Sequence, residues 1–352
     1  MDGKFSKLRF KEFAKAAAAG AIAGAIALQP TGGQAATGSV TITVGNARWF
    51  VNTNITFSTT SSGSLALSSA SLHTAAATPG SFYNRNDAFD GALTWHVYSS
   101  PPGGADQSGG YFQAGGVVSV TSNSVVGPNK TLAGLTVHSE LFFPSSKAVV
   151  RSILYMQNPT GSPITVTVDN DNNLGSDIGT TILATSSGDT TFDSTDNWVV
   201  SCQQSITPGV CDLTLDPVLT YAFQGPGGIR ATNAGPIFAN GNGFPNFRFS
   251  LVTVPAGETR AVMMFVQLSD TPADAEVDAA LFNSNETLIG TDYLSGLSRQ
   301  QFSEIVNWNV TGFGVPTLTQ WAQAGMALLL GFAGLVSAGL FGRRRRRSAG
   351  SS

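Results

Sequence analysis

The chain has few charges and lacks the motifs that most enzymes carry. Only 12% of its 352 residues are charged, and it has three histidines and two cysteines. It contains no Gly-x-Ser-x-Gly elbow, no His-Glu-x-x-His pair, no P-loop and no Gly-x-Gly-x-x-Gly turn after a strand. These absences exclude the common signatures of serine hydrolases, zinc proteases and nucleotide-binding enzymes. We therefore expect a protein that is not an enzyme.

The charges that are present are unevenly distributed. Five of the 19 basic residues lie within the first 15 positions, and five more form the block 343–347. Between these ends remain nine basic and 20 acidic residues, a net charge of −11. So acidic a body does not attract nucleic acid by charge, and we expect no nucleic-acid partner.

An uncharged, mostly apolar stretch covers residues 321–341. As a helix, its 21 residues would measure about 31 Å, close to the roughly 30 Å hydrocarbon core of a bilayer. The block that follows comprises Arg343, Arg344, Arg345, Arg346 and Arg347. Each arginine costs about 2.5 to 3.5 kcal/mol at mid-membrane, so the block predicts a membrane stop with the C-terminus in the cytoplasm. A buried core helix with a solvated basic tail is the alternative.

A short motif precedes this stretch: Val315, Pro316, Thr317, Leu318 and Trp321. Pro316 lacks a backbone donor and disfavours helix at Val315, which predicts an extended, accessible segment at the membrane face. With the apolar stretch and the arginines, the motif resembles the IPTL-CTERM class of bacterial sorting signals, which is related to the PEP-CTERM class. Val315 and Ala322 replace the Ile and Gly of that class. The resemblance covers residues 315–347. It implies processing by an exosortase-like membrane enzyme and release or attachment at the cell surface. A single-span anchor that is never cut is the alternative.

The N-terminus has the features of an export signal. Basic residues precede an apolar run over residues 16–28, and small residues follow. We predict a secretory signal peptide cleaved after Ala35 or Ala36; an uncleaved anchor is the alternative. The predicted organisation is a signal peptide (1–36), an exported body (37–314), a sorting signal (315–347) and a tail (348–352).

The two cysteines, Cys202 and Cys211, have eight residues between them. In an oxidising compartment, a close pair of this kind predicts one local disulfide. A metal-binding pair is less favoured, because no other cysteine and only three histidines could complete the site.

Apolar residues alternate with polar ones in many segments between residues 40 and 268. This period-two pattern predicts an all-β body, a large antiparallel β-sandwich. No Pro-rich linker divides it, so we expect one domain, with a soft boundary near residues 100–116. Turns rich in Pro and Gly predict two hairpins. In the first, strands 148–157 and 164–168 flank a turn at 158–163. In the second, strands 247–254 and 259–268 flank a turn at 255–258.

Two short helices are predicted after the last strand. Thr271 stands as an N-cap before Pro272, with Asp274 three residues later, and opens a helix through about Asn283. Ser298 and Gln301 open a second helix through about residue 306. The full fold prediction is thus a β-sandwich with two short C-terminal helices and a C-terminal transmembrane helix.

An Asp-rich segment, residues 169–177, follows the predicted strand 164–168, so we predict a loop at one end of the sheet. It offers oxygen ligands of the kind calcium prefers, namely Asp169, Asp171, Asn173 and Asp177. Calcium is therefore the only cofactor that the sequence suggests. The segment departs from an EF-hand loop, since the sixth position is Leu174 and the twelfth is Thr180. A solvated turn in which Asx side chains bond their own backbone is the favoured interpretation, with no cofactor, and calcium binding is the alternative.

Other candidate residues are weaker. Asp87 and Asp90 could form a glycosidase-type pair of carboxylates. His96 and His138 lie in alternating strands, which favours structural roles. Aromatic residues exposed on a sheet could stack on sugar rings, although most aromatics in such folds are core. The aromatic candidates are Trp49, Phe50, Tyr83, Trp95, Tyr98, Tyr111, Phe112 and Trp198.

Together these features predict an exported bacterial cell-surface or matrix protein with a structural or adhesive role. It would begin as a precursor anchored in the inner membrane through residues 321–341. Its expected partners are the export machinery, an exosortase-like enzyme and the membrane. A carbohydrate-binding surface protein, with polysaccharide as partner, and a secreted glycan-active enzyme are the alternatives.

Overall fold

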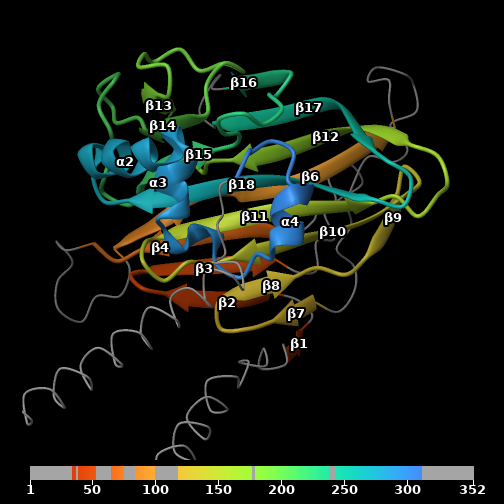
Figure 1. Cartoon of the computed structure of the whole chain (residues 1–352). Helices are drawn as coiled ribbons and strands as arrows, with labels where there is room; N and C mark the ends of the chain where they lie inside the picture. The colour runs from red at the N-terminus through yellow and green to blue at the C-terminus, as the bar shows by residue number, and fades with distance from the viewer. Residues whose placement is uncertain are drawn as a thin grey trace, which may run out of the picture.

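The computed structural model describes residues 34–36, 39–52, 65–74, 84–99, 118–176, 179–237 and 243–310. These residues form two antiparallel sheets packed face to face, with short helices over the outer face of one sheet (Figure 1). The predicted all-β sandwich is confirmed. The predicted transmembrane stretch, the sorting motif and the arginine block lie outside the described residues.

The larger sheet has ten strands in the order β1-β7-β8-β10-β11-β18-β15-β14-β13, with β9 paired to β10. Its strands are β1 (Gln34–Ala36), β7 (Val118–Val120), β8 (Ser124–Val126), β9 (Lys130–Leu132), β10 (Leu135–Phe142), β11 (Val149–Gln157), β13 (Thr180–Thr185), β14 (Trp198–Gln203), β15 (Val218–Ala222) and β18 (Thr259–Ser269).

The smaller sheet has eight strands in the order β16-β17-β12-β6-β4-β3-β2, with β5 paired to β4. Its strands are β2 (Ser39–Val44), β3 (Ala47–Asn52), β4 (Ala66–Leu72), β5 (Arg85–Ala88), β6 (Gly91–Ser99), β12 (Ile164–Asn173), β16 (Asn233–Ile237) and β17 (Phe244–Val254).

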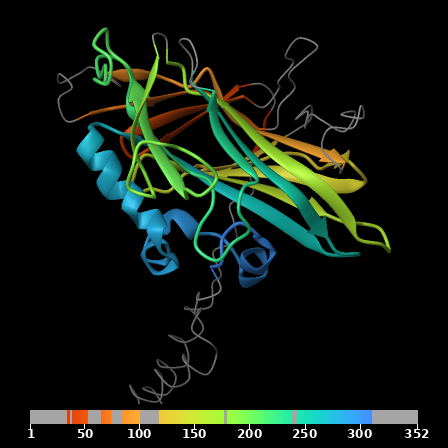
Figure 2. The same ribbon diagram turned by 90° about the horizontal axis from the view of Figure 1, so that it is seen from above.

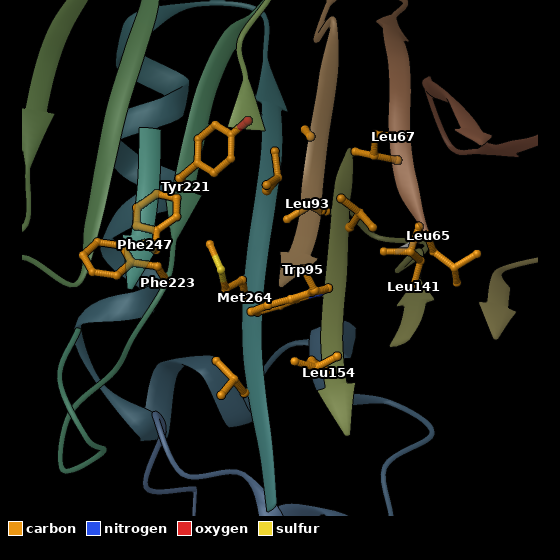
Figure 3. Close-up of a cluster of buried hydrophobic side chains, with 14 of the residues drawn as sticks. Leu65, Leu67, Leu93, Trp95, Leu141, Leu154, Tyr221, Phe223, Phe247 and Met264 are labelled. Carbon is orange, nitrogen blue, oxygen red and sulfur yellow. The ribbon is translucent and has the colours of Figure 1, made fainter. Parts of the chain in front are cut away.

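The main core lies between the two sheets and explains the alternation in the sequence. Along β6, Leu93, Trp95 and Val97 are fully buried and face the core. Thr94 and His96, which alternate with them, face away from it. Figure 3 shows Trp95 within this cluster, with aromatic rings gathered on one side of it and leucines on the other. Removing so much apolar surface from water is the main term that stabilises the fold.

The two predicted hairpins are both wrong, because each turn joins one sheet to the other. β11 belongs to the larger sheet and β12 to the smaller one, and β17 and β18 are divided in the same way. β11 pairs with β18, and β12 pairs with β17. The two connections therefore form arches that lie side by side at one end of the sandwich (Figure 2).

Asn158 holds the two arches together. It is fully buried, and its Nδ2 donates to the carbonyl oxygens of Ser162 (2.8 Å) and Val254 (2.9 Å). Its Oδ1 accepts from the backbone N–H of Thr160 at 2.9 Å. Its own backbone N–H donates to the carbonyl of Glu258 at 2.9 Å. One side chain thus satisfies backbone groups from both turns, which a pair of independent hairpins would not need.

The C-terminal segment covers the outer face of the larger sheet (Figure 1). It consists of α2 (Pro272–Ala279), η1 (Ala280–Asn283), α3 (Asn285–Ile289), η2 (Asp292–Leu294) and α4 (Arg299–Glu304). Both predicted helix starts are confirmed: Thr271 caps α2, and Ser298 with Gln301 forms a capping box at α4. Among the helices that the structure describes, none has the length and apolar character needed to cross a membrane.

Arg151 fixes this helical layer to the sheet. Its guanidinium donates to the carbonyl oxygens of Tyr293 (2.8 Å) and Ser295 (3.0 Å) and lies over the ring of Phe142. Desolvation by burial lowers the pKa of Arg151 to about 10. The helical layer covers the outer face of the larger sheet, and the candidate site lies on the outer face of the smaller sheet.

Candidate functional site

The Asp-rich segment belongs to strand β12, so the predicted loop is wrong. β12 continues to Asn173, and the period-two alternation continues through its polar residues. Asp169 and Asp171 face outward, while Asn170 and Asn172 face inward and are buried. Within this inward pair, Asn172 Nδ2 donates to Asn170 Oδ1 at 2.9 Å and to a backbone carbonyl of β17 at 3.1 Å, whereas Asn170 Nδ2 has no hydrogen-bond partner among the described residues. These bonds let two amides remain in the strand at the edge of an apolar core.

Polar side chains from three neighbouring strands gather on the outer face of the smaller sheet. We call this group the polar patch. It comprises Thr94, His96 and Tyr98 of β6, Thr167, Asp169 and Asp171 of β12, and Asn246 and Arg248 of β17. The register places Asp169 between His96 and Arg248, and the next outward row places Asp171 between Thr94 and Asn246. Cross-strand neighbours of this kind are close enough for their side chains to interact.

Asp169 and Arg248 form the rigid part of the patch. Arg248 donates twice to Asp169, from Nε to Oδ1 at 2.8 Å and from a terminal nitrogen to Oδ2 at 2.6 Å. The hydrogen bond to Asp169 raises the pKa of Arg248, against the effect of desolvation. The Asp169 side chain is only 3% exposed, whereas that of Arg248 is 40% exposed. Bidentate pairing therefore holds a partly accessible guanidinium in one orientation.

Asp171 is the accessible carboxylate of the patch. Its Oδ2 lies 3.0 Å from His96 Nε2, and its Oδ1 accepts from Asn246 Nδ2. Burial would raise the pKa of Asp171, but the hydrogen bonds from His96 and Asn246 and the charge of Arg248 lower it below its ordinary value. The Asp171 side chain is 47% exposed and that of His96 is 3% exposed. Asp171 therefore stays ionised and faces solvent.

Tyr98 and Thr167 form the far end of the patch. Tyr98 is partly exposed, and its ring lies parallel to that of His96, with 6.1 Å between the centroids. Tyr98 is also close enough to Arg248 to affect the pKa of the guanidinium. Thr167 pairs with Tyr98 across the strands, and its hydroxyl is buried without a hydrogen-bond partner in the described part of the chain.

The geometry suits binding better than proton transfer. A His–Asp dyad that moves protons needs the imidazole to meet the substrate while the carboxylate orients it from behind. Here the order is reversed, because the imidazole of His96 is buried and the carboxylate of Asp171 is exposed. What the patch offers to a ligand is a carboxylate, a guanidinium, an amide and one aromatic face.

The structure gives the predicted calcium ligands other contacts. Asp169 and Asp171 are bound within the patch, and Asn173 Oδ1 accepts from the backbone N–H of Gly175 at 3.0 Å. Asp177 lies outside the described residues. Within the ranges that the structure describes, no group of three or more His, Cys, Asp or Glu side chains could hold a metal ion.

The other catalytic candidates are not brought together. Asp87 lies in β5, and Asp90 is exposed in the turn before β6. His138 lies on the outer face of the larger sheet, 3.6 Å from Glu140 and stacked on Tyr155. It therefore shares no site with His96, which lies on the other sheet.

Three of the five candidate aromatic residues that the structure describes belong to the core. Trp49, Trp95 and Trp198 are at most 6% exposed. Phe50 and Tyr98 are partly exposed, on β3 and β6 of the smaller sheet. Tyr83, Tyr111 and Phe112 lie outside the described residues. The described residues thus form no broad aromatic platform, and Tyr98 is the one candidate that belongs to the polar patch.

The predicted disulfide is confirmed. Cys202 at the end of β14 is bonded to Cys211, with 5.6 Å between the Cα atoms. Cys202 is buried under the helical layer, and the loop that the bond closes carries Ile206, which is 92% exposed.

The structure describes only part of the predicted signal peptide and none of the predicted sorting signal. Ala35 and Ala36, the predicted cleavage positions, lie in β1, which pairs with β7. At the other end, the described chain stops at Val310, five residues before Val315.

Sequence reasoning missed Asn246 and Arg248, because only the register of β12 and β17 brings them to Asp171 and Asp169. A usable signal was present on β12, where Thr165, Thr167, Asp169 and Asp171 continue one polar face of the strand.

No protein-family model matches the chain, and no curated protein resembles it in sequence. Solved structures similar in shape include a Synechocystis protein, at a TM-score of 0.40 and 9% identity over 67% of this chain and 97% of that one. A galactose mutarotase-like protein from Lactobacillus casei has a TM-score of 0.40 and 10% identity over 66% of this chain and all of that one. The GH36 α-galactosidase AgaA from Geobacillus stearothermophilus has a TM-score of 0.37 and 10% identity over 67% of this chain and 41% of that one. Likeness this low assigns neither a family nor a ligand.

Proposed function

We propose that the chain is an exported bacterial protein with a structural or adhesive role at the cell surface or in the matrix, and that it is not an enzyme. Residues 1–36 would direct its export, and the motif Val315, Pro316, Thr317 and Leu318 would present it to an exosortase-like processing enzyme. The disulfide between Cys202 and Cys211 supports an oxidising destination.

The observation that carries this proposal is the close attachment of the body to the predicted sorting signal. Asn307 Nδ2 donates to the carbonyl oxygens of Phe223 and Met263, both at 2.7 Å. The indole of Trp308 donates to the same Met263 carbonyl at 2.8 Å, and Val310 is buried. The folded body is therefore held firmly up to Val310.

Only residues 311–314 separate this anchored end from the motif. Five residue steps reach from Val310 to Val315, so even a fully extended chain spans about 18 Å. The sandwich would consequently sit beside the membrane while the signal is processed. A short spacer of this kind suits a protein displayed or released as a folded unit.

Carbohydrate binding is the second candidate function. The polar patch supports it, because Tyr98 offers a ring face beside the accessible side chains of Asp171 and Arg248. A glycan-active enzyme is less favoured, since the imidazole of His96 is buried behind the carboxylate that it contacts.

The sorting step can be tested by changing Pro316, Thr317 and Leu318 together to alanine. If the motif is processed, the variant should accumulate at full length in the inner membrane, whereas the wild type is shortened and leaves that fraction. Alanine at Ser348, Ser351 and Ser352, in the tail, should change nothing. Equal processing of the motif variant and the wild type, judged by mass and fractionation, would contradict the proposal.

A further inference from the structure

We propose that the polar patch binds a neutral sugar ring of a glycan, with Asp171, Arg248 and Tyr98 as the residues that contact it. This inference rests on the proposed surface role and gives that role a ligand class and a site.

The hydrogen-bonding groups of the patch are accessible and already oriented. Arg248 is held by two bonds to Asp169, and Asp171 is held by His96 and Asn246. Both outer side chains nevertheless keep 40% or more of their surface exposed. A carboxylate accepts hydrogen bonds and a guanidinium donates them, so neighbouring groups of this kind can bind two adjacent hydroxyls. Because the protein orders these side chains before binding, little conformational entropy is lost when the ligand arrives.

Tyr98 supplies the apolar part of the site. A sugar ring presents C–H groups on its faces and hydroxyls at its rim, so it fits a surface with one aromatic face and several polar groups. The ring of Tyr98 is partly exposed and is supported from within the patch by the parallel imidazole of His96. Aromatic rings with such support provide contact area at a small entropic cost.

The charge of the patch favours a neutral ligand over an anionic one. Asp169 is neutralised by Arg248 through two bonds, so Asp171 is the carboxylate that the patch presents to a ligand. The whole body between the two ends carries −11. A phosphate, sulfate or uronate would therefore meet net repulsion, while uncharged hydroxyls would not.

Thr167 leaves hydrogen-bonding capacity unused at the Tyr98 end. Its buried hydroxyl has no partner among the described residues, which is unfavourable for a polar group removed from water.

The test uses the full chain on an array that carries neutral hexose oligosaccharides beside uronic acid and sulfated glycans, followed by titration calorimetry with the best neutral glycan. The wild type should bind neutral glycans with a Kd below about 1 mM and should show no preference for anionic ones. Asp171→Asn and Tyr98→Leu should each weaken binding at least about 10-fold, equivalent to about 1.4 kcal/mol.

Two variants control for general effects. Tyr98→Phe keeps the ring and should bind within about threefold of the wild type. Glu276→Gln removes an exposed carboxylate from α2, over the other sheet, and should bind like the wild type. Melting curves identify any variant that has lost its fold, and if Asp171→Asn is one of them, the Tyr98 pair decides the question.

Three results would overturn the inference: no binding of any neutral glycan, preference for anionic glycans, or full binding by both Asp171→Asn and Tyr98→Leu. Fractionation of the same strains reports separately on the proposed surface role. A protein that is exported and processed normally but binds no glycan would refute the site and leave the surface role in place.

Discussion

Trp95 and Ser152 are joined by a hydrogen bond that crosses the interior of the sandwich. The indole Nε1–H of Trp95 on β6 donates to the hydroxyl of Ser152 on β11 at 2.8 Å, and both side chains are buried. The bond links the smaller sheet to the larger one inside the apolar cluster of Figure 3. It fixes how the two sheets are placed against each other, which apolar contacts alone specify less sharply.

Replacing Ser152 with alanine should therefore destabilise the fold by about 1 to 3 kcal/mol, because the indole N–H loses its acceptor in a dry interior. Urea unfolding of the two proteins measures this difference. Ser303→Ala is the control: its hydroxyl donates to Gln300 at an exposed position on α4, and we expect a change below about 0.5 kcal/mol. Equal effects of the two substitutions would show that the cross-sheet bond has no special weight.

Asn158→Ala should cost about 3 kcal/mol, since it leaves the backbone groups of Ser162, Val254 and Thr160 without their side-chain partner. Asn158→Asp keeps the acceptor oxygen but loses the donor, so its effect should also be large. Thr160→Ala removes a single partner of Asn158 that is itself exposed. It should therefore lower the free energy of unfolding clearly less than Asn158→Ala does. A small effect of Asn158→Ala in urea unfolding would mean that the arches are stable without this side chain.

The arches also show where sequence reasoning ends. Alternation located the strands, and the capping residues Thr271 and Ser298 located two helix starts, because both signals are local. Whether the chain folds back into the same sheet or crosses to the other is not local. Turns at residues 158–163 and 255–258 allow either path, and pairing between β11 and β18 decides it.

The polar patch could not be predicted from the sequence for a related reason. Asp169 and Asp171 stand next to asparagines, and that composition is typical of loops. The segment is nonetheless a strand, because Asn170 and Asn172 find partners inside, and Arg248 and His96 meet the aspartates outside. Arg248 and His96 lie more than 70 residues away from these aspartates along the chain, so no nearby pattern reveals them. The disulfide, by contrast, could be predicted from the spacing of the two cysteines.

Loss of the Cys202–Cys211 disulfide should lower stability by roughly 2 to 3 kcal/mol, the loop-closure value for a short loop. Changing both cysteines to serine and comparing urea unfolding with and without reductant tests this. Reductant should destabilise the wild type and leave the double variant unchanged. A wild type insensitive to reductant would show that the bond contributes little.

Gly225→Ala should weaken the attachment of the C-terminal segment. A Cβ at Gly225 would lie 2.0 Å from the indole of Trp308, so the ring or the loop has to move. We expect a cost of about 1 to 3 kcal/mol and faster proteolysis near residue 310. Gly161→Ala is the matched control, because a Cβ there meets nothing within 4 Å. Similar behaviour of the two variants would argue against a firmly held end.

Acid should remove the contribution of Asp171. Its pKa in the folded protein is lowered below the unfolded value of about 3.9, so its stabilising effect is complete above about pH 5 and is lost as the pH falls through the folded pKa. The difference in stability between the wild type and Asp171→Asn should therefore shrink between pH 6 and pH 3, as measured by urea unfolding. Ser303→Ala changes no ionisable group, so its difference from the wild type should not depend on the pH in this way. A gap for Asp171→Asn that widens in acid would reverse the assigned sign.

The paired arches limit when the interior can close. Asn158 and Glu258 are bonded to each other although about 100 residues separate them, and β12 cannot find β17 until residues 244–254 are available. Non-local pairing of this kind makes folding slow and leaves unpaired strands open to aggregation. If the chain crosses the membrane N-terminus first, its leading half has to wait in an unfolded form on the far side. A periplasmic holdase would then have its main task during that interval, before the last two strands emerge.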